Sequence, residues 1–304
     1  MKNKKLVGNT LLIIAAIVWG YAYIPQSVGM DYVNPFTFNG ISCILAGIAL
    51  VPACAIFDLL KKKKGIYNKP TKEETKTLIV GGISCGVILF VASTLQQYGI
   101  ANTTVGKAGF ISVLYILIVP FIEFFMKKPL PKSIWICCFI ALIGLYLLCI
   151  NENLTYQKGD LFVFLGAICY SFHIITIDRF SPKTDGPKLS CIQFITAGLL
   201  SSIFIFAVDK PTVSAIISAR LPIIYAGIVS GGVGYTLQII GQKWTDSTVA
   251  SLLLSLESVF ALLSGMFFLF QIPTLREAIG CVLMFIAIII VQLPGKNNKE
   301  EKEI

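Results

Sequence analysis

Ten long runs of apolar residues, separated by short polar segments, make up most of the chain. An α-helix rises about 1.5 Å per residue, so roughly 20 apolar residues cross the hydrocarbon core of a bilayer. The pattern therefore predicts an all-α integral membrane protein with ten transmembrane helices. The predicted spans are 9–28, 34–57, 77–97, 103–125, 132–150, 159–178, 189–208, 220–241, 247–269 and 275–293.

The composition agrees with a membrane protein. Of the 304 residues, 56% are hydrophobic and 13% are charged, whereas soluble domains carry about 25% charged residues. A soluble fold of this size would leave too much apolar surface in water. The net charge of +9 does not indicate a nucleic-acid partner, because the basic residues lie between the apolar runs and not on a basic helix with interleaved aromatic residues.

The sequence predicts no metal site and no cofactor. All nine cysteines lie inside apolar runs, and Cys137 and Cys138 are adjacent, unlike the spaced cysteines of metal sites. His173 is the only histidine. The phosphate-binding pattern G-x-x-x-x-G-K-[ST] is absent from the chain, so we do not expect ATP to drive the protein directly.

The positions of lysine and arginine predict that both termini are cytoplasmic. With the N-terminus inside, the inside segments hold 20 of the 25 basic residues, the outside segments hold four, and Lys107 falls within a span. Cytoplasmic loops of membrane proteins carry such an excess. We therefore expect a multi-pass protein of the cell membrane with an even number of spans.

Short patches of the first half of the chain recur, in the same order, in the second half. Gln97 aligns with Gln242 at an offset of 145 residues, and Trp19 aligns with Tyr170 at an offset of 151. The conserved order of five patches favours a repeat over chance similarity between apolar helices. The matched patches are 81–86 with 226–231, 103–105 with 247–249, 16–17 with 167–168, 46–47 with 197–198, and Pro129 with Pro273.

Each half contains five predicted spans, and because five is odd, the second half enters the membrane from the opposite side. We therefore expect two inverted five-helix repeats, over residues 1–150 and 151–295, followed by a cytoplasmic tail over 296–304. Inverted repeats are common in secondary transporters, whose solute site lies near the midplane between the halves.

Four ordered motifs carry a resemblance to a known family. They are Trp19-Gly20, 34–39, 98–104 and 254–260. Together they resemble the drug/metabolite transporter superfamily, in its ten-helix branch built from two EamA-type repeats. Two positions depart from the family pattern, because Ser42 stands where an arginine is common and Gln271 where an acidic residue is frequent. The resemblance implies export or exchange of small metabolites and does not single out one substrate.

Ionisable residues inside predicted spans are the first candidates for a functional site, because burying them in a bilayer is costly. Glu257 falls near the midplane, where its carboxylate would bind a substrate or a proton, or accept a hydrogen bond from another helix. Lys107 would neutralise a substrate carboxylate, pair with Glu257, or extend to the outer interface. His173 is suited to proton transfer, although a packed histidine with one hydrogen bond is the commoner role.

Polar and aromatic side chains in the spans complete the expected site. They would hydrogen-bond a solute, form cavity walls or stack on a cation, or else only pack between helices. Pro25 and Pro120 are expected to kink the first and fourth spans. The expected substrate-binding residues are Trp19, Tyr23, Gln97, Lys107, Tyr115, His173 and Glu257, and no residue is expected to be catalytic.

The sequence favours a secondary transporter, an exporter or exchanger of a small solute such as an amino acid or amine, working by alternating access. A lipid flippase or a non-transporting membrane partner would share this architecture. A membrane-embedded enzyme is disfavoured, because no nucleophile and base stand in a recognisable arrangement. The sequence leaves proton coupling open, as well as the choice between a monomer and a homodimer.

The predicted topology is testable with reporter fusions. We expect fusions after Lys296 and within residues 61–69 to report a cytoplasmic location, and a fusion near Asn153 to report an external one, because of the bias in basic residues. A paired alkaline phosphatase and green fluorescent protein reporter makes the measurement. An external C-terminus would contradict both the even number of spans and the inverted repeat.

Overall fold

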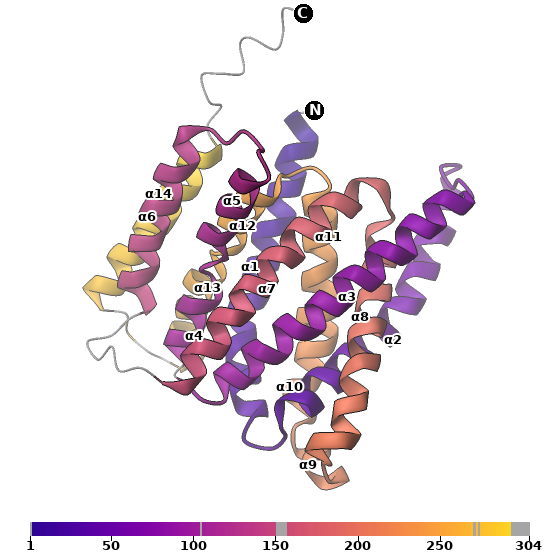
Figure 1. Cartoon of the computed structure of the whole chain (residues 1–304), viewed down its shortest axis with the longest axis horizontal. Coiled ribbons are helices and arrows are strands. Elements are labelled where there is room, and N and C mark those ends of the chain that lie inside the picture. The colour runs from indigo at the N-terminus through magenta and orange to yellow at the C-terminus, as the bar shows by residue number, and fades with distance from the viewer. Residues whose placement is uncertain (1, 104, 150–156, 270–271, 273, 293–304) are drawn as a thin grey trace, which may run out of the picture.

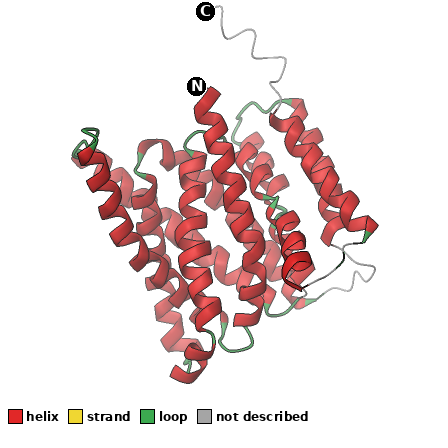
Figure 2. Cartoon of the chain, turned by 180° about the vertical axis from the view of Figure 1, so that it is seen from behind, coloured by secondary structure: helices red, strands yellow, loops and turns green. Residues whose placement is uncertain are grey.

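The computed structural model describes residues 2–103, 105–149, 157–269, 272 and 274–292. Gln271 and the predicted tail over 296–304 lie outside the described residues. The described part of the chain is all-helical and contains no strand (Figure 2). Its helices are α1 (Lys2–Gly29), α2 (Pro35–Lys63), α3 (Lys72–Ile100), α4 (Val105–Ser112), α5 (Tyr115–Phe125), α6 (Lys132–Cys149), α7 (Lys158–Phe180), η1 (Ser181–Lys183), α8 (Gly186–Phe204), η2 (Ile205–Asp209), α9 (Val213–Ser218), α10 (Arg220–Ile224), η3 (Tyr225–Tyr235), α11 (Thr236–Gln242), α12 (Ser247–Leu254), α13 (Glu257–Leu269) and α14 (Leu275–Gln292).

Within the described residues, eight helical stretches are long and apolar enough to cross a membrane. They coincide with the first four predicted spans and with the sixth to ninth. They are 3–29, 35–63, 72–100, 107–125, 158–183, 186–209, 220–242 and 247–264. The helices α6 and α14 occupy the fifth and tenth predicted spans.

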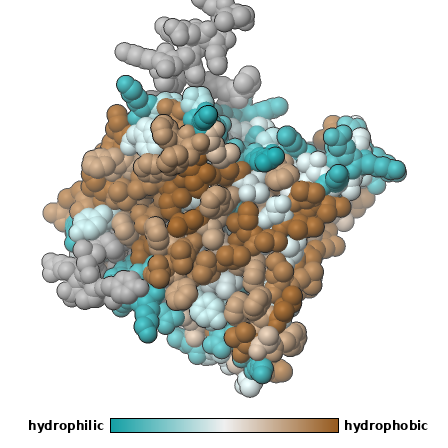
Figure 3. Space-filling view, viewed as in Figure 1, coloured by the Kyte–Doolittle hydropathy of each residue, from teal (hydrophilic) through white to brown (hydrophobic). Residues whose placement is uncertain are grey.

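Apolar side chains cover the outside of the bundle as well as its inside. Ile48 on α2 and Leu199 on α8 are more than half exposed, although both lie in the middle of apolar helices. In Figure 3 hydrophobic residues dominate the middle of the visible face, and hydrophilic residues gather towards its edges. This arrangement is that of a protein whose solvent is lipid.

The helices form two flanking groups around a central one (Figure 1). The helices α2, α3, α7 and α8 pack together on one side, while α6 and α14 pair on the other. Between them, α1 contacts α11, α12, α13 and η3, and α5 contacts α7 and α12. In the second half of the chain, the central helix α1 therefore packs against the segment from α10 to α13.

Glycines make the closest crossings between helices. A Cβ built on Gly47 of α2 would lie 2.8 Å from Ile195 of α8, and one on Gly198 of α8 would lie 2.8 Å from Ile44 of α2. The offset of 151 residues that relates Gly47 to Gly198 also relates Ile44 to Ile195. The crossing of α2 and α8 is thus reciprocal.

A second crossing of this kind joins α6 to α14. A Cβ on Gly144 would lie 2.8 Å from the carbonyl oxygen of Gly280, and one on Gly280 would lie 2.6 Å from the carbonyl oxygen of Gly144. The two backbones are therefore in direct contact, an approach that any side chain larger than hydrogen would block.

Two membrane-length helices are interrupted near their middles. Residues 113–114, between α4 and α5, and residues 255–256, between α12 and α13, form turns, although Leu114 and Ser255 keep right-handed helical backbone angles. Pro120 lies inside α5, downstream of the first break. A proline cannot donate to the carbonyl four residues earlier, and the freed carbonyl of Ile116 accepts a hydrogen bond from Cys138 Sγ at 3.3 Å. Pro25 stays within the continuous helix α1.

Glycine crossings predict a measurable stability difference. We expect Gly280→Ala to destabilise the protein by about 1–3 kcal/mol, because the new Cβ overlaps the backbone of α6. The control is Gly109→Ala, where a Cβ would meet nothing within 4 Å, so the better helix propensity of alanine leaves stability unchanged or slightly higher. Thermal unfolding in detergent measures both, and equal midpoints for the two variants would contradict the crossing.

Candidate functional site

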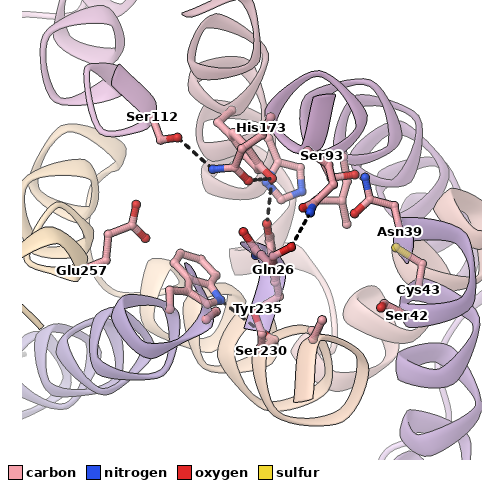
Figure 4. Close-up of a pocket in the computed structure, with 18 of the residues that line it drawn as sticks. Gln26, Asn39, Ser42, Cys43, Ser93, Ser112, His173, Ser230, Tyr235 and Glu257 are labelled. Carbon is pink, nitrogen blue, oxygen red and sulfur yellow. Dashed lines mark hydrogen bonds between the residues drawn. The ribbon is translucent and has the colours of Figure 1, made fainter. Parts of the chain in front are cut away.

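A cavity lies in the centre of the bundle and has a volume of about 100 Å³. This volume is smaller than the roughly 300–1,000 Å³ of most small-molecule pockets. Helices of both halves of the chain supply its walls (Figure 4). The lining residues are Trp19, Ala22, Tyr23, Gln26, Phe38, Asn39, Ser42, Cys43, Leu89, Ser93, Gln96, Gln97, Ser112, Tyr115, Tyr170, His173, Ile174, Phe194, Ala226, Ser230, Gly231, Tyr235, Gln238, Leu254 and Glu257.

Glu257 lines the cavity directly after the turn at residues 255–256 that interrupts the helix between α12 and α13. It is the first residue of α13, and its side chain is 6% exposed. A Cβ on Gly20 of α1 would lie 2.5 Å from the carbonyl oxygen of Glu257, so only glycine permits this approach of α1 to α13. One turn further along α1, Tyr23 Oη donates a hydrogen bond to Glu257 Oε1 at 3.2 Å.

Trp19 connects α1 to the second half on another side of the cavity. Its Nε1 donates to the backbone oxygen of Ser230 at 3.2 Å, and its ring centroid lies 4.6 Å from that of Tyr235. Both partners lie in η3, which is a π-helix of 11 residues. A Cβ on Gly234 would lie 2.6 Å from Trp19 Nε1, so glycine makes room for the indole. Such π-helical segments are frequent at functional sites.

A chain of hydrogen bonds runs through the cavity wall and ends at Ser112. Tyr235 Oη donates to Tyr170 Oη at 3.5 Å, Tyr170 Oη to Gln96 Oε1 at 3.0 Å, and Gln96 Nε2 to Ser112 Oγ at 2.9 Å. Ser112 lines the same cavity as Tyr23, whose hydroxyl donates to Glu257. The chain links η3, α7, α3 and α4.

Several polar atoms in the wall are buried without a hydrogen-bond partner among the described residues. A buried polar group without a partner is costly, and a ligand that supplies one recovers this cost. Figure 4 shows Glu257 and Ser112 on one side of the cavity and Asn39, Ser42 and Cys43 on the other. The atoms without partners are Gln26 Oε1, Asn39 Nδ2, His173 Nδ1 and Gln238 Oε1.

His173 and Gln97 are both fixed by contacts between helices. His173 is fully buried, and its Nε2 lies 3.1 Å from Gln193 Oε1 on α8. Gln97 Nε2 donates to the backbone oxygen of Gln26 at 3.0 Å, so it ties α3 to α1. Among the described residues, no three histidine, cysteine, aspartate or glutamate side chains are grouped so as to hold a metal ion.

Lys107 lies outside the cavity, at the end of the molecule where α7 begins. Its Nζ is 3.5 Å from Asp160 Oδ2, and the two side chains are only 13% and 16% exposed. Thr103 adds contacts to Asp160 and to Gln157 Oε1. The structure thus pairs Lys107 with Asp160 and not with Glu257.

At the opposite end of the molecule, Glu123 is buried between α5, α7 and α12. Its carboxylate accepts hydrogen bonds from Ser247 and Thr248 in the first turn of α12. Lys128 Nζ lies 2.6 Å from Glu123 Oε1 and 3.8 Å from Asp178 Oδ2. Each end of the bundle therefore has its own polar cluster, separate from the central cavity.

Six of the seven residues expected from the sequence line the cavity, and Lys107 does not. The sequence did not predict a place in the site for the residues that form the hydrogen-bond chain, which are Gln96, Ser112, Tyr170 and Tyr235. The repeat offered a usable indication for Tyr170, because it aligns with Trp19. Helical spacing offered another, since Ser93 and Gln96 share a face with Gln97.

Comparison with known proteins gives a consistent result. A family model described as the EamA-like transporter family matches residues 6–150 and again residues 157–293. An uncharacterized transporter of Archaeoglobus fulgidus is 25% identical over 292 residues, which cover 95% of this chain and 87% of that protein. The uncharacterized transporter YwfM of Bacillus subtilis is 23% identical, with 96% and 95% covered. A crystal structure with 19% identity matches the fold with a TM-score of 0.74, covering 96% of this chain and 97% of the other.

The contacts of Glu257 predict which residue it is coupled to. In a double-mutant cycle, we expect Tyr23→Phe and Glu257→Gln to show a coupling of about 1–3 kcal/mol in unfolding free energy, because a hydrogen bond to a charged group is lost in each. Lys107→Met with Glu257→Gln should be additive within about 0.5 kcal/mol. Unfolding in detergent measures both cycles. If Lys107 proved coupled to Glu257 and Tyr23 did not, Lys107 and not Tyr23 would be the partner of Glu257.

Proposed function

The chain belongs to the EamA-like transporter family, and on this basis we propose that it is a secondary transporter that exports or exchanges a small metabolite by alternating access. The protein is a membrane transporter with a small-molecule solute, as its family and its apolar helices indicate. The observation that carries the finer proposal is the central cavity, because polar and aromatic side chains from both halves meet there inside an apolar bundle.

We propose ten transmembrane helices, arranged as inverted repeats over residues 1–150 and 151–295. The reciprocal crossings support this arrangement, because a two-fold axis between the halves exchanges Gly47 with Gly198. The pairing of helices supports it too, since the contact of α3 with α7 corresponds to the contact of α1 with α11 and η3. The aligned residues Gln97 and Gln242 also behave alike, since Gln242 Nε2 donates to the backbone oxygen of Ile174 at 3.0 Å.

We propose that the solute binds among the six expected residues that line the cavity. Glu257 supplies the only carboxylate among the described residues that line it, His173 and Gln97 supply polar atoms, and the aromatic rings form the walls. Lys107 would act at a distance from the solute, as part of the polar cluster with Asp160. The clusters at Lys107 and Glu123 would then open in turn, each exposing the cavity to one side of the membrane.

We also propose a location for the protein, an energy source for transport and an oligomeric state. The excess of basic residues in alternate loops supports a plasma-membrane protein with both termini in the cytoplasm. The transported solute would move without direct use of ATP, as an exchange or coupled to an ion such as the proton. A monomer contains all the residues that line the cavity.

Counterflow in proteoliposomes tests the transport proposal. Vesicles loaded with an unlabelled mixture of amino acids and amines should accumulate a labelled component from outside, because alternating access exchanges solutes across the bilayer. We expect Glu257→Gln to reduce this exchange at least about tenfold, which corresponds to about 1.4 kcal/mol. Imposing a pH gradient on the same vesicles shows whether a proton moves with the solute.

Two controls make the counterflow result decisive. Glu73 is an exposed carboxylate in the first turn of α3, so Glu73→Gln should retain full exchange. Vesicles carrying a fluorescent phospholipid test for a flippase by its accessibility to dithionite. Lipid movement without any solute exchange would replace the solute transporter with a lipid flippase.

A further inference from the structure

The central cavity is lined by an acidic side chain but by no lysine or arginine among the described residues. Glu257 is the only aspartate or glutamate among its described lining residues, and none of these is a lysine or arginine. Two basic residues of the polar clusters at the ends of the bundle have acidic partners outside the cavity, since Lys107 pairs with Asp160 and Lys128 with Glu123. An ionised Glu257 therefore gives the cavity a net negative charge.

Glu257 is incompletely compensated by the protein. Its Oε1 accepts a hydrogen bond from Tyr23, the Tyr115 hydroxyl also interacts with its carboxylate, and no ion pair to it occurs within the described part of the chain. Removing a carboxylate from water without a cationic partner is unfavourable. A positively charged occupant would supply the missing partner, so the cavity favours a cation over a neutral or anionic molecule.

The rest of the wall also suits a cation that bears N–H groups. Seven tryptophan, tyrosine and phenylalanine residues line the cavity, and their ring faces attract cations. The oxygens Gln26 Oε1 and Gln238 Oε1 are buried acceptors that lack a donor among the described residues. An ammonium group carries three N–H donors and no acceptor, which matches one carboxylate and amide oxygens. The seven aromatic residues are Trp19, Tyr23, Phe38, Tyr115, Tyr170, Phe194 and Tyr235.

A zwitterionic amino acid fits these groups less well. Its carboxylate would require a cationic side chain or several donors. The side-chain amide donor without a partner in the cavity wall, Asn39 Nδ2, lies on the far side from Glu257 (Figure 4). One neutral amide does not compensate the desolvation of a carboxylate.

We propose that the solute is a small primary amine that carries a positive charge and no carboxylate, bound with its ammonium group against Glu257 and its apolar part between the aromatic walls. This inference rests on the proposed function, because it assumes that the central cavity is the solute site. It narrows the solute from metabolites in general to amine cations.

Four phenyl compounds of similar shape test the role of charge. They are phenethylamine, which is cationic, 2-phenylethanol, which is neutral, phenylalanine, which is zwitterionic, and 3-phenylpropionate, which is anionic. Binding to the purified full chain is measured by isothermal titration calorimetry in detergent. We expect phenethylamine to bind at least about tenfold more tightly than each of the other three, and Glu257→Gln to remove this preference while Glu73→Gln retains it.

The comparison of ligands on the wild-type protein stands even if Glu257→Gln fails to fold. Equal or tighter binding of phenylalanine or 3-phenylpropionate would overturn the inference, and so would the absence of phenethylamine binding up to its solubility limit. Counterflow of labelled phenethylamine separates this inference from the transport proposal. If other solutes are exchanged but no amine binds, the inference of an amine solute is wrong and the transport proposal stands. If an amine binds but no solute is exchanged, the transport proposal is wrong and the inference about the binding site stands.

Discussion

Close contact between helix backbones at glycine is the constraint on which the rest of this structure depends. In lipid, burying apolar side chains between helices gains little, because the hydrocarbon tails are equally apolar. Helices therefore associate through dense packing, and packing is densest where no side chain intervenes. At the crossings of α2 with α8 and of α6 with α14, glycines bring backbone atoms to distances that no other residue allows. These crossings hold the outer helices in place around the broken helices in the centre.

The same constraint builds the site. Gly20 lets α1 approach the backbone of Glu257, and Tyr23 follows one turn later on the same face of α1. The tyrosine hydroxyl thereby reaches the carboxylate of a residue 234 positions away in the chain. Trp19, next to Gly20, joins α1 to η3 through its hydrogen bond to the backbone oxygen of Ser230.

The sequence predicted the helical membrane fold well, because a long apolar run has few alternatives in a bilayer. Six of the seven candidate residues that it indicated by polarity and depth line the cavity. Depth alone did not place Lys107, since a residue near a helix end can face any direction and this one faces Asp160. The sequence did not indicate residues of the hydrogen-bond chain such as Gln96 and Ser112. Each is a single uncharged polar residue in an apolar run, and its role depends on partners on other helices. No proline or glycine occurs at the turn before Glu257, so the sequence gives no signal for this interruption of the helix and only the structure shows it.

The hydrogen bonds along the cavity wall have a consequence for how the helices can move. Tyr235, Tyr170, Gln96 and Ser112 lie on η3, α7, α3 and α4, so three consecutive hydrogen bonds tie segments of both halves of the chain together. Breaking one of them inside an apolar bundle leaves buried polar groups without partners, which is unfavourable. A rearrangement that separates the two halves at this wall therefore has to exchange these hydrogen bonds for contacts with water or with an occupant of the cavity.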